Sequence, residues 1–387
     1  MTAHLVMDGE QPDRLATMVE NVVGADAPRR EGGLKVSGQA RYVAEIQRPG
    51  TAVGVFARAT VARGKIVDID ANAVCAMPGV LAVIDDDRLL RNPAQGGAGE
   101  APVQGPKDVA YFGQPIALVV AETFEQARHA AQNLVVRSEE SEAVVSPESA
   151  DQDVEDPGDD AFSQGDIDQA IADAPVSIDA VYATPSQNSA AMEPHAAIAE
   201  WDGDNLCLHG SYQMLQFNRK ELADSLQVDP DNVRIVAEYV GGGFGSKLGL
   251  SPEATAAAIA ARDLGRSVRV VMSRQQVFEG TMRRTETRQR GRRDADTDGR
   301  LLALGHDDWV SNLPDESFSE PVTAATRFLY GGGHRRFVHK IARVNRTCAG
   351  SMRAPGEAVG MLALECAMDE LAHAARIDPV ALRLLNI

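Results

Sequence analysis

Residues 240–247 read VGGGFGSK, and this glycine run is the first stretch of the sequence that could do chemistry. Glycine loses more backbone entropy on folding than any other residue, so a run of glycines needs a reason. A strand that enters a glycine-rich turn close to a helix start presents backbone N–H groups that can bind phosphate or oxo groups. From glycine alone, two interpretations stay open: a tight structural turn, and a cradle for an anionic ligand or cofactor.

Two familiar nucleotide-binding motifs each fail here. A P-loop needs G-x-x-x-x-G-K-[ST], but Ser246 stands where glycine should be and Leu248 follows the lysine. A dinucleotide fingerprint needs G-x-G-x-x-G; Gly241 and Gly243 fit it, but Ser246 replaces the third glycine. A nucleotide-binding protein is therefore a disfavoured alternative, which protection by ATP or NAD against thermal unfolding would support.

Three further segments carry polar residues with two possible roles. In SMRAPGEAVG (351–360), Arg353 precedes a rigid turn and a predicted helix, so it is either an anion clamp or a surface arginine. In MEPHA (192–196), Glu193 and His195 are either acid–base groups or turn anchors. The run MRRTETRQRGRR (282–293) is expected to place many of its arginines on one solvated strand face, the alternative being a contact with pyrophosphate or an acidic partner.

The elements that must position these segments follow from hydrophobic periodicity and capping signals. Strands are expected over 34–46, 51–71 and 115–122. A short helix, a Pro-Gly turn and a strand are expected over 74–90. A helix is expected over 123–136, with Thr123 as its N-cap and Gln126 in the capping-box position.

The second half of the chain follows the same logic. Residues 221–228 read as a short helix and 233–240 as the strand that enters the glycine run. Residues 251–265 read as a helix with Ser251 as cap, Pro252 at its first position and Gly265 at its end. Residues 269–273 read as a strand, a hairpin turns at Asp298-Gly299, and 356–377 read as a long amphipathic helix followed by Pro379.

Length and cysteine usage bound the class of protein. With 387 residues, two or more domains are expected. No run of about 18 apolar residues exists, and the N-terminus lacks the basic flank and apolar core of a secretion signal. The four cysteines are widely spaced without C-x-x-C, which argues against an iron–sulfur cluster, a structural zinc site or a disulfide framework, and favours reduced thiols in the cytoplasm.

The charge is strongly acidic and unevenly distributed. Lys and Arg number 38 against 56 Asp and Glu, a net charge of −18. Residues 138–218 contain no Lys or Arg but 18 Asp and Glu. This argues against nucleic acid as a partner. The acidic stretch is either solvated surface or a docking face for a basic partner chain.

Taken together, these segments resemble the molybdenum-binding subunit of the xanthine dehydrogenase/aldehyde oxidase family, the molybdenum hydroxylases, in its bacterial aldehyde-oxidising branch. GGGFGSK is similar to that family's GGGFG-x-K loop, and SMRAPGEAVGMLALE is similar to its arginine-containing segment. MEPHA, Tyr212-Gln213, GLKVSGQARYVAEI and the final DPVALRLLNI occur in the family order. The resemblance runs from about residue 30 to the last residue.

The resemblance implies an α+β chain with an α/β hammerhead domain followed by the first molybdenum-cofactor-binding domain. The boundaries that we expect are a leader over 1–29, the hammerhead domain over 30–145, an acidic linker over 146–171 and the molybdopterin-binding domain over 172–387. The family holds a molybdopterin with Mo, in bacteria usually as the cytosine dinucleotide. It hydroxylates aldehydes or aromatic heterocycles with water and passes electrons to Fe–S and FAD, which lie on partner subunits in multi-chain members.

The site residues that the resemblance implies are carried over one by one. Gln213 would hydrogen-bond the oxo ligand of the metal. Gly242, Gly243, Phe244 and Gly245 would lie against the Mo centre, with backbone N–H groups near its oxo group. Arg353 and Ala354 would reach the pterin and the Mo end of the site. No residue would ligate Mo directly, because the pterin holds the metal.

Two departures from the family matter. Purine-oxidising members carry a glutamate just after G-x-K, where this chain has Leu248, so the resemblance favours an aldehyde or an apolar aromatic substrate. The family's general base is a glutamate late in a second molybdenum domain, and nothing here matches it, so we expect the chain to be inactive alone. A partner chain that carries the second domain would complete the site; the alternatives are a truncated, non-catalytic assembly module and one fragment of a longer protein.

Overall fold

The computed structural model describes residues 25–97, 99–101, 104–149, 154–156 and 161–387. These residues belong to two compact units, one ending at Arg41 and the other running from Tyr42 to Ile387. Residues 1–24 of the expected leader, and 150–153 and 157–160 of the expected acidic linker, lie outside the described residues.

The strand expected over 34–46 is wrong. In the first unit, Gly32–Val36 form helix α2, where the Ser37 hydroxyl donates a hydrogen bond to the carbonyl of Gly33 at 2.7 Å. In the second unit, Val43–Glu45 form the short 3₁₀ helix η1, closed by a capping box between Tyr42 and Glu45. Local side-chain contacts to the backbone thus outweigh the apolar alternation that suggested a strand.

The second unit is built on three sheets. In chain order, their strands are β1 (Ala52–Arg58), β2 (Gly64–Asp70), β3 (Val80–Ile84), β4 (Asp108–Val109), β5 (Pro115–Ala121), β6 (Val135–Glu140), β7 (Val154–Glu155), β8 (Phe162–Gln164), β9 (Val176–Thr184), β10 (Ala196–Asp202), β11 (Asn205–Gly210), β12 (Val233–Val236), β13 (Val268–Val271), β14 (Thr287–Ala295), β15 (Leu301–Asn312) and β16 (His334–Arg343).

Helices connect and cover these strands. In chain order, they are α3 (Asn72–Cys75), α4 (Phe124–Asn133), η2 (Pro147–Ser149), α5 (Ile167–Asp173), α6 (Leu215–Leu226), η3 (Pro230–Asn232), α7 (Pro252–Leu264), α8 (Arg274–Gly280), α9 (Ala324–Phe328), α10 (Glu357–Ala375) and α11 (Pro379–Asn386). No helix in the described part of the chain has both the length and the apolar character needed to cross a membrane.

The largest sheet has the strand order β12-β11-β10-β13-β1-β5-β3 and joins both halves of the chain. Strand β1 pairs in parallel with β13, so that Ala52 lies opposite Val268. At the next inward-facing pair, a side chain at Gly54 would meet Val270 at 2.9 Å, which explains the glycine in this strand. Strands from the predicted hammerhead region and from the region after residue 172 therefore share one sheet.

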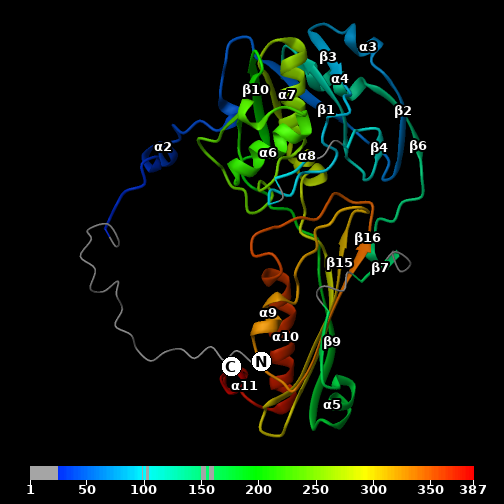
Figure 1. Cartoon of the computed structure of the whole chain (residues 1–387), viewed down its shortest axis with the longest axis vertical. Coiled ribbons are helices and arrows are strands. Elements are labelled where there is room, and N and C mark those ends of the chain that lie inside the picture. The colour runs from blue at the N-terminus through cyan, green and yellow to red at the C-terminus, as the bar shows by residue number, and fades with distance from the viewer. Residues whose placement is uncertain (1–24, 98, 102–103, 150–153, 157–160) are drawn as a thin grey trace. The chain divides into compact units, whose positions relative to one another are not determined.

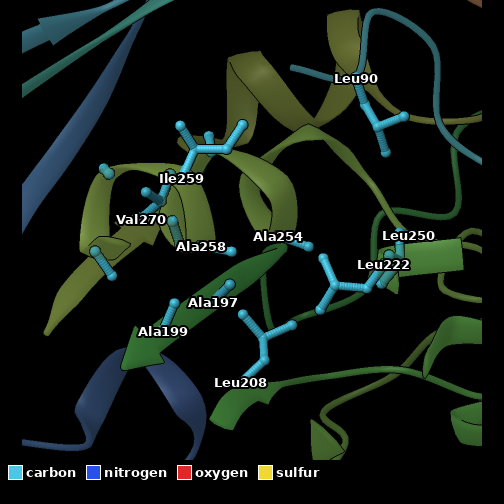
Figure 2. Packing of buried hydrophobic residues seen from close by; sticks show 14 of the residues in the cluster. Leu90, Ala197, Ala199, Leu208, Leu222, Leu250, Ala254, Ala258, Ile259 and Val270 are labelled. Carbon is cyan, nitrogen blue, oxygen red and sulfur yellow. The ribbon is translucent and has the colours of Figure 1, made fainter. Parts of the chain in front are cut away.

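Helix α7 covers this sheet with small side chains. Its residues Pro252–Ala261 are all buried, and most of them are alanine. Figure 2 shows Ala254 and Ala258 of α7 beside Ala197 and Ala199 of β10. Because alanine adds little bulk, the helix approaches the strands closely, and this core fixes the start of α7 just after the glycine run.

The second sheet has the order β7-β16-β15-β14-β9, with β8 also paired to β16, so the described residues of the expected acidic linker contribute two short strands to it. Helix α10 packs on β9 and β14, and α5 contacts β14, β15 and β16 (Figure 1). The expected hairpin connects β14 to β15, with Gly299 in the left-handed region at φ +90°. A small third sheet has the order β4-β2-β6.

Candidate functional site

The glycine run and the segment around Arg353 meet in the fold. The backbone N–H of Arg353 donates a hydrogen bond to the carbonyl of Phe244 at 2.8 Å. Gly245 lies against the same segment, because a Cβ atom built on it would be 2.3 Å from the carbonyl oxygen of Ser351 and 2.5 Å from the Cα of Met352. The cradle interpretation requires these two segments to share one place in the fold, and they do.

Gln213 joins the same site from the loop after β11. Its side-chain Oε1 accepts a hydrogen bond from the backbone N–H of Gly245 at 3.0 Å, and the backbone N–H of Gln213 donates to the carbonyl of Lys247 at 2.8 Å. With Oε1 engaged, the side-chain NH₂ group remains as a donor. The side chains of Gln213, Phe244, Arg353 and Ala354 are exposed, whereas Gly243 and Gly245 are buried.

The close approach that excludes side chains from the glycine run is made by the protein's own atoms. A Cβ atom on Gly241 would lie 2.5 Å from the Cβ of Glu193, and one on Gly243 would lie 2.3 Å from Oε1 of Gln213. Gly242 and Gly245 also have φ angles of +102° and +104°, which other residues rarely adopt. The tight-turn interpretation therefore explains the glycines themselves, and any ligand would be bound by what the turn presents outward.

The turn presents backbone donors and a strained aromatic residue. Within the described chain, the N–H groups of Gly242, Gly243 and Phe244 donate no hydrogen bond. Phe244 itself has φ +55°, an outlier for a bulky residue, and its side chain is 46% exposed. Strain of this kind persists only where the surroundings impose it, and it gathers at functional sites.

A buried ion pair supports the glycine run from below. The carboxylate of Glu193 accepts hydrogen bonds at Oε2 from the N–H of Gly241 at 2.7 Å, the hydroxyl of Ser211 at 2.6 Å and the ammonium of Lys247 at 3.2 Å. The side chain of Lys247 is fully buried, and burial lowers its pKa while Glu193 opposes that shift. Glu193 and Lys247 thus hold the two ends of the loop together.

His195 is a second anchor of the same loop. Its Nε2 lies 3.1 Å from the carbonyl oxygen of Ser246, and the ring is buried. Burial lowers the pKa of His195 to about 3, so the imidazole is neutral and donates its Nε2–H to that carbonyl. Both side chains are buried, and the turn-anchor alternative for Glu193 and His195 describes their contacts.

These contacts predict different losses of unfolding free energy when Gly243 and Gly245 are each replaced with alanine. Gly243→Ala would press only on the movable side chain of Gln213, so we expect the free energy of unfolding to fall by about 1 kcal/mol through loss of the Gln213–Gly245 hydrogen bond. Gly245→Ala would combine a left-handed φ with a clash against fixed backbone, and we expect a loss of about 1–3 kcal/mol. Urea denaturation of both variants measures the difference, and equal losses would contradict this explanation.

The solvated face expected for the arginine-rich run is wrong for most of its arginines. Arg283, Arg284, Arg292 and Arg293 are buried, while Arg288 is exposed. Arg292 and Arg293 lie on β14, which is between β9 and β15 with α10 and α5 packed against it, while Arg283 and Arg284 precede β14 and form bridges to Ala349 and Gln187. Each buried guanidinium reaches an oxygen acceptor, as the geometry of a buried charge requires. The sequence singled out the run but gave no sign that it turned inward.

Among the described residues, one cluster of side chains has the chemical types that could ligate a metal ion, and it is not part of the sequence-predicted site. Glu200, Cys207 and His209 bring ligand atoms within 4.8 Å of one another on β10 and β11. Arg48 already donates hydrogen bonds to Glu200 and, at 2.7 Å, to Nε2 of His209. A guanidinium therefore takes the place that a cation would need, and we interpret the group as an ion-pair network.

Comparisons with known proteins agree with this architecture. Residues 37–142 match the aldehyde oxidase and xanthine dehydrogenase a/b hammerhead domain, and residues 149–387 match the molybdopterin cofactor-binding domain. The chain is 41% identical over 386 residues to the aldehyde oxidoreductase molybdenum-binding subunit PaoC of Escherichia coli K12, covering 98% of this chain and 51% of that protein.

Two other relatives extend the comparison. The nicotinate dehydrogenase large molybdopterin subunit of Eubacterium barkeri is 28% identical over 384 residues, covering 94% of this chain and 89% of that protein. The aldehyde oxidoreductase structure from Desulfovibrio gigas has a TM-score of 0.81 and 27% identity, covering 93% of this chain and 43% of that one.

The chain thus spans about half the length of the Escherichia coli relative. The expected order of a hammerhead domain followed by a molybdenum-cofactor-binding domain is confirmed by the two family matches. The chain belongs to the molybdenum-binding subunits of the aldehyde oxidase and xanthine dehydrogenase family.

Proposed function

We propose that this chain is the molybdenum-cofactor-binding component of an oxidoreductase that hydroxylates an aldehyde or an aromatic heterocycle with water. The observation that carries the proposal is the meeting of Gln213, the turn at 242–245 and Arg353 on one exposed surface. The family match over 149–387 supports a molybdopterin as the group that binds there.

The residues present fit such a group. The free N–H groups of Gly242, Gly243 and Phe244 and the side-chain NH₂ of Gln213 are donors suited to oxo and phosphate oxygens. The guanidinium of Arg353 is exposed and makes no hydrogen bond or ion pair to any residue that the structure describes. When bound, the cofactor would supply two-electron redox chemistry and the activation of water. The chain's own residues would orient it and bind its oxygens.

The substrate class follows from a side chain that cannot hydrogen-bond. Leu248 stands where purine-oxidising relatives carry a glutamate, and it is partly buried. An apolar residue there leaves the polar edge of a purine unsatisfied, so we propose an aldehyde or an apolar aromatic substrate. The name of the Escherichia coli relative, an aldehyde oxidoreductase subunit, supports the first of these.

The remaining components are proposed from the same family relationship. We propose the cytosine dinucleotide form of molybdopterin, electron transfer to Fe–S and FAD subunits, and a location in the cytoplasm, which the free thiols of Cys75, Cys207, Cys348 and Cys366 support. We propose that the chain is inactive alone and that a partner chain supplies a second molybdenum domain with the general-base glutamate.

The test is metal analysis of the chain co-purified with the proposed Fe–S, FAD and second-domain partner chains. We expect about one Mo and one pterin per chain in the complex, and aldehyde-dependent dye reduction that the chain alone does not show. Arg353→Ala should lower Mo retention about tenfold or more, because it removes charge-assisted hydrogen bonds worth about 1.5–3 kcal/mol. The matched control Arg288→Ala removes another exposed arginine and should retain Mo.

The result that would overturn the proposal is a fully assembled complex without Mo. That outcome would favour the truncated assembly module instead. A complex with Mo whose content is unchanged by Arg353→Ala would keep the family chemistry but remove Arg353 from the cofactor contact.

A further inference from the structure

Beneath the turn that carries Arg353 lies a buried ion pair between Arg284 and Glu320. Their side chains are 3% and 0% exposed, and Nη1 of Arg284 donates to Oε1 of Glu320 at 2.9 Å. The guanidinium also donates to the carbonyl of Ala354 at 3.3 Å through Nη1 and to the carbonyl of Arg353 through Nη2. Oε1 of Glu320 accepts the N–H of Gly356 at 2.7 Å. The pair therefore contacts three of the four residues of the turn at 353–356.

The turn needs this support because its backbone is strained. Ala354 has φ +57°, a left-handed conformation that brings the Cβ of a non-glycine residue too close to the following carbonyl oxygen, and Gly356 has φ +79°. A Cβ on Gly356 would lie 2.2 Å from the carbonyl oxygen of Pro321, so the turn is wedged against the segment that carries Glu320. Helix α10 begins at the next residue, Glu357.

The way in which the guanidinium divides its donors points to a role in placing the turn. Arg–carboxylate pairs are frequently bidentate, with two parallel N–H···O hydrogen bonds to the carboxylate. Here Nη1 is shared between Glu320 and the Ala354 carbonyl, and Nη2 donates to the Arg353 carbonyl. Among the described residues, Nε of Arg284 and Oε2 of Glu320 have no hydrogen-bond partner. Buried polar atoms without partners are destabilising. The arrangement therefore gives up hydrogen bonds within the ion pair and uses a guanidinium donor to hold the backbone of the turn.

Arg284 is itself fixed by a second layer of contacts. Its N–H donates to the carbonyl of Gln187 at 2.9 Å, and its carbonyl accepts from the N–H of Gln187 and from the hydroxyl of Ser186. A residue held at its backbone and at its side chain transmits its position to whatever it binds. What it binds is the carbonyl of the Arg353–Ala354 peptide bond and the next carbonyl, that of Ala354.

We propose that Arg284 and Glu320 are positioning residues that lock the left-handed turn at 353–356 and so present the Arg353 side chain beside Phe244. We call this restraint of the turn the lock. Its role, which is to hold the Arg353 side chain in place for an anionic cofactor, rests on the proposed function. The lock itself is a property of the chain and can be measured without any cofactor.

The experiment uses trypsin, because the locked turn contains a cleavable Arg353–Ala354 bond. Arg284→Lys keeps a cation for Glu320 but lacks the fork that reaches the Arg353 and Ala354 carbonyls. Mass spectrometry of the complex during limited digestion should show the fragment pair 1–353 and 354–387 forming about tenfold faster in Arg284→Lys than in the unchanged chain. Mo content per chain is measured on the same samples and should fall in the same variant.

The matched control is the neighbouring arginine. Arg283 is equally buried and donates to Glu286, to the carbonyl of Thr347 and to Ser311, but not to the turn. We expect Arg283→Lys to change the rate of cleavage after Arg353 by less than about twofold, even if it lowers thermal stability as much as Arg284→Lys does. Glu320→Gln against Glu286→Gln repeats the comparison from the acid side, should an arginine variant fail to fold.

The outcomes separate the two proposals. Equal cleavage after Arg353 in the Arg284 and Arg283 variants, and in both glutamine variants, would overturn the positioning role. Faster cleavage in the Arg284 or Glu320 variant only, in a complex that carries no Mo even when unchanged, would keep the lock and overturn the cofactor function. Faster cleavage together with loss of Mo supports both.

Discussion

Replacing Lys247 with methionine is expected to lower the free energy of unfolding by about 3–5 kcal/mol, the usual consequence of leaving one partner of a buried ion pair alone. Methionine fills a similar volume but leaves the carboxylate of Glu193, 5% exposed, without its cation. That carboxylate also holds the N–H of Gly241 and the hydroxyl of Ser211, so the glycine run would loosen with it. Urea denaturation of the full chain measures the loss.

Two controls make this result specific to the buried charge. In Lys247→Met/Glu193→Gln the charge disappears while the acceptor for Gly241 remains, and we expect at least half of the loss to be recovered. Arg290→Met breaks an ion pair with Asp179 whose partners are 42% and 44% exposed, and it should cost no more than about 1 kcal/mol. A loss below about 1 kcal/mol in Lys247→Met would show that the pair does not hold the loop.

The elements that the sequence predicted well are those with local signals. The capping box of Thr123 and Gln126 starts α4 as expected, and Pro252 and Gly265 bound α7. The hairpin turns at Gly299 because a left-handed position there favours glycine. In each case the residues that decide the structure lie within a few positions of one another, so no knowledge of distant contacts is needed.

Sequence signals mislead elsewhere, where other local contacts or a distant strand decide the structure. Ser251 occupies the N-cap of α7, yet its hydroxyl makes no cap hydrogen bond. Residues 34–46 alternate like a strand but form helical turns instead. The sheet shared by β1 and β13 joins residues as distant in the chain as Ala52 and Val268, and nothing in either strand alone specifies that pairing.

The candidate site divides in the same way. Sequence motifs indicate Gln213, Gly242–Gly245 and Arg353 as site residues, and the structure brings these residues together. The supports under them were not selected, because Arg284 and Glu320 act only through contacts that tertiary folding creates. A buried charge leaves no local signature in sequence, and a run of arginines is equally compatible with a solvated face and a buried one.

The second large effect is a pH dependence that originates in Glu253. This residue lies in the first turn of α7, is buried, and accepts a hydrogen bond from the hydroxyl of Tyr212 at 3.4 Å. Burial raises the pKa of Glu253 from 4.5 to about 7, against smaller opposing contributions that include Lys247. The folded chain therefore keeps this proton between pH 4.5 and 7, whereas the unfolded chain has lost it.

The sign of the effect follows from proton linkage. Where the folded state binds more protons, stability falls as pH rises, so the contribution of Glu253 is fully present below pH 4.5 and is lost as pH rises through 7. We expect Glu253→Gln, which stays neutral, to gain about 2–3 kcal/mol in unfolding free energy relative to the unchanged chain between about pH 5 and pH 8. Urea denaturation at the two pH values measures this gain.

The control is Glu125→Gln, which removes an exposed glutamate from the first turn of α4. A gain in this exposed control as large as in Glu253→Gln would contradict the assignment of the effect to a buried carboxyl. The consequence reaches the candidate site through Tyr212, whose hydroxyl bonds Glu253 and whose next residue is Gln213. Ionising Glu253 therefore places a buried charge beside the residue that precedes Gln213, whose side chain holds Gly245, and the turn should loosen at the alkaline end of the same pH range.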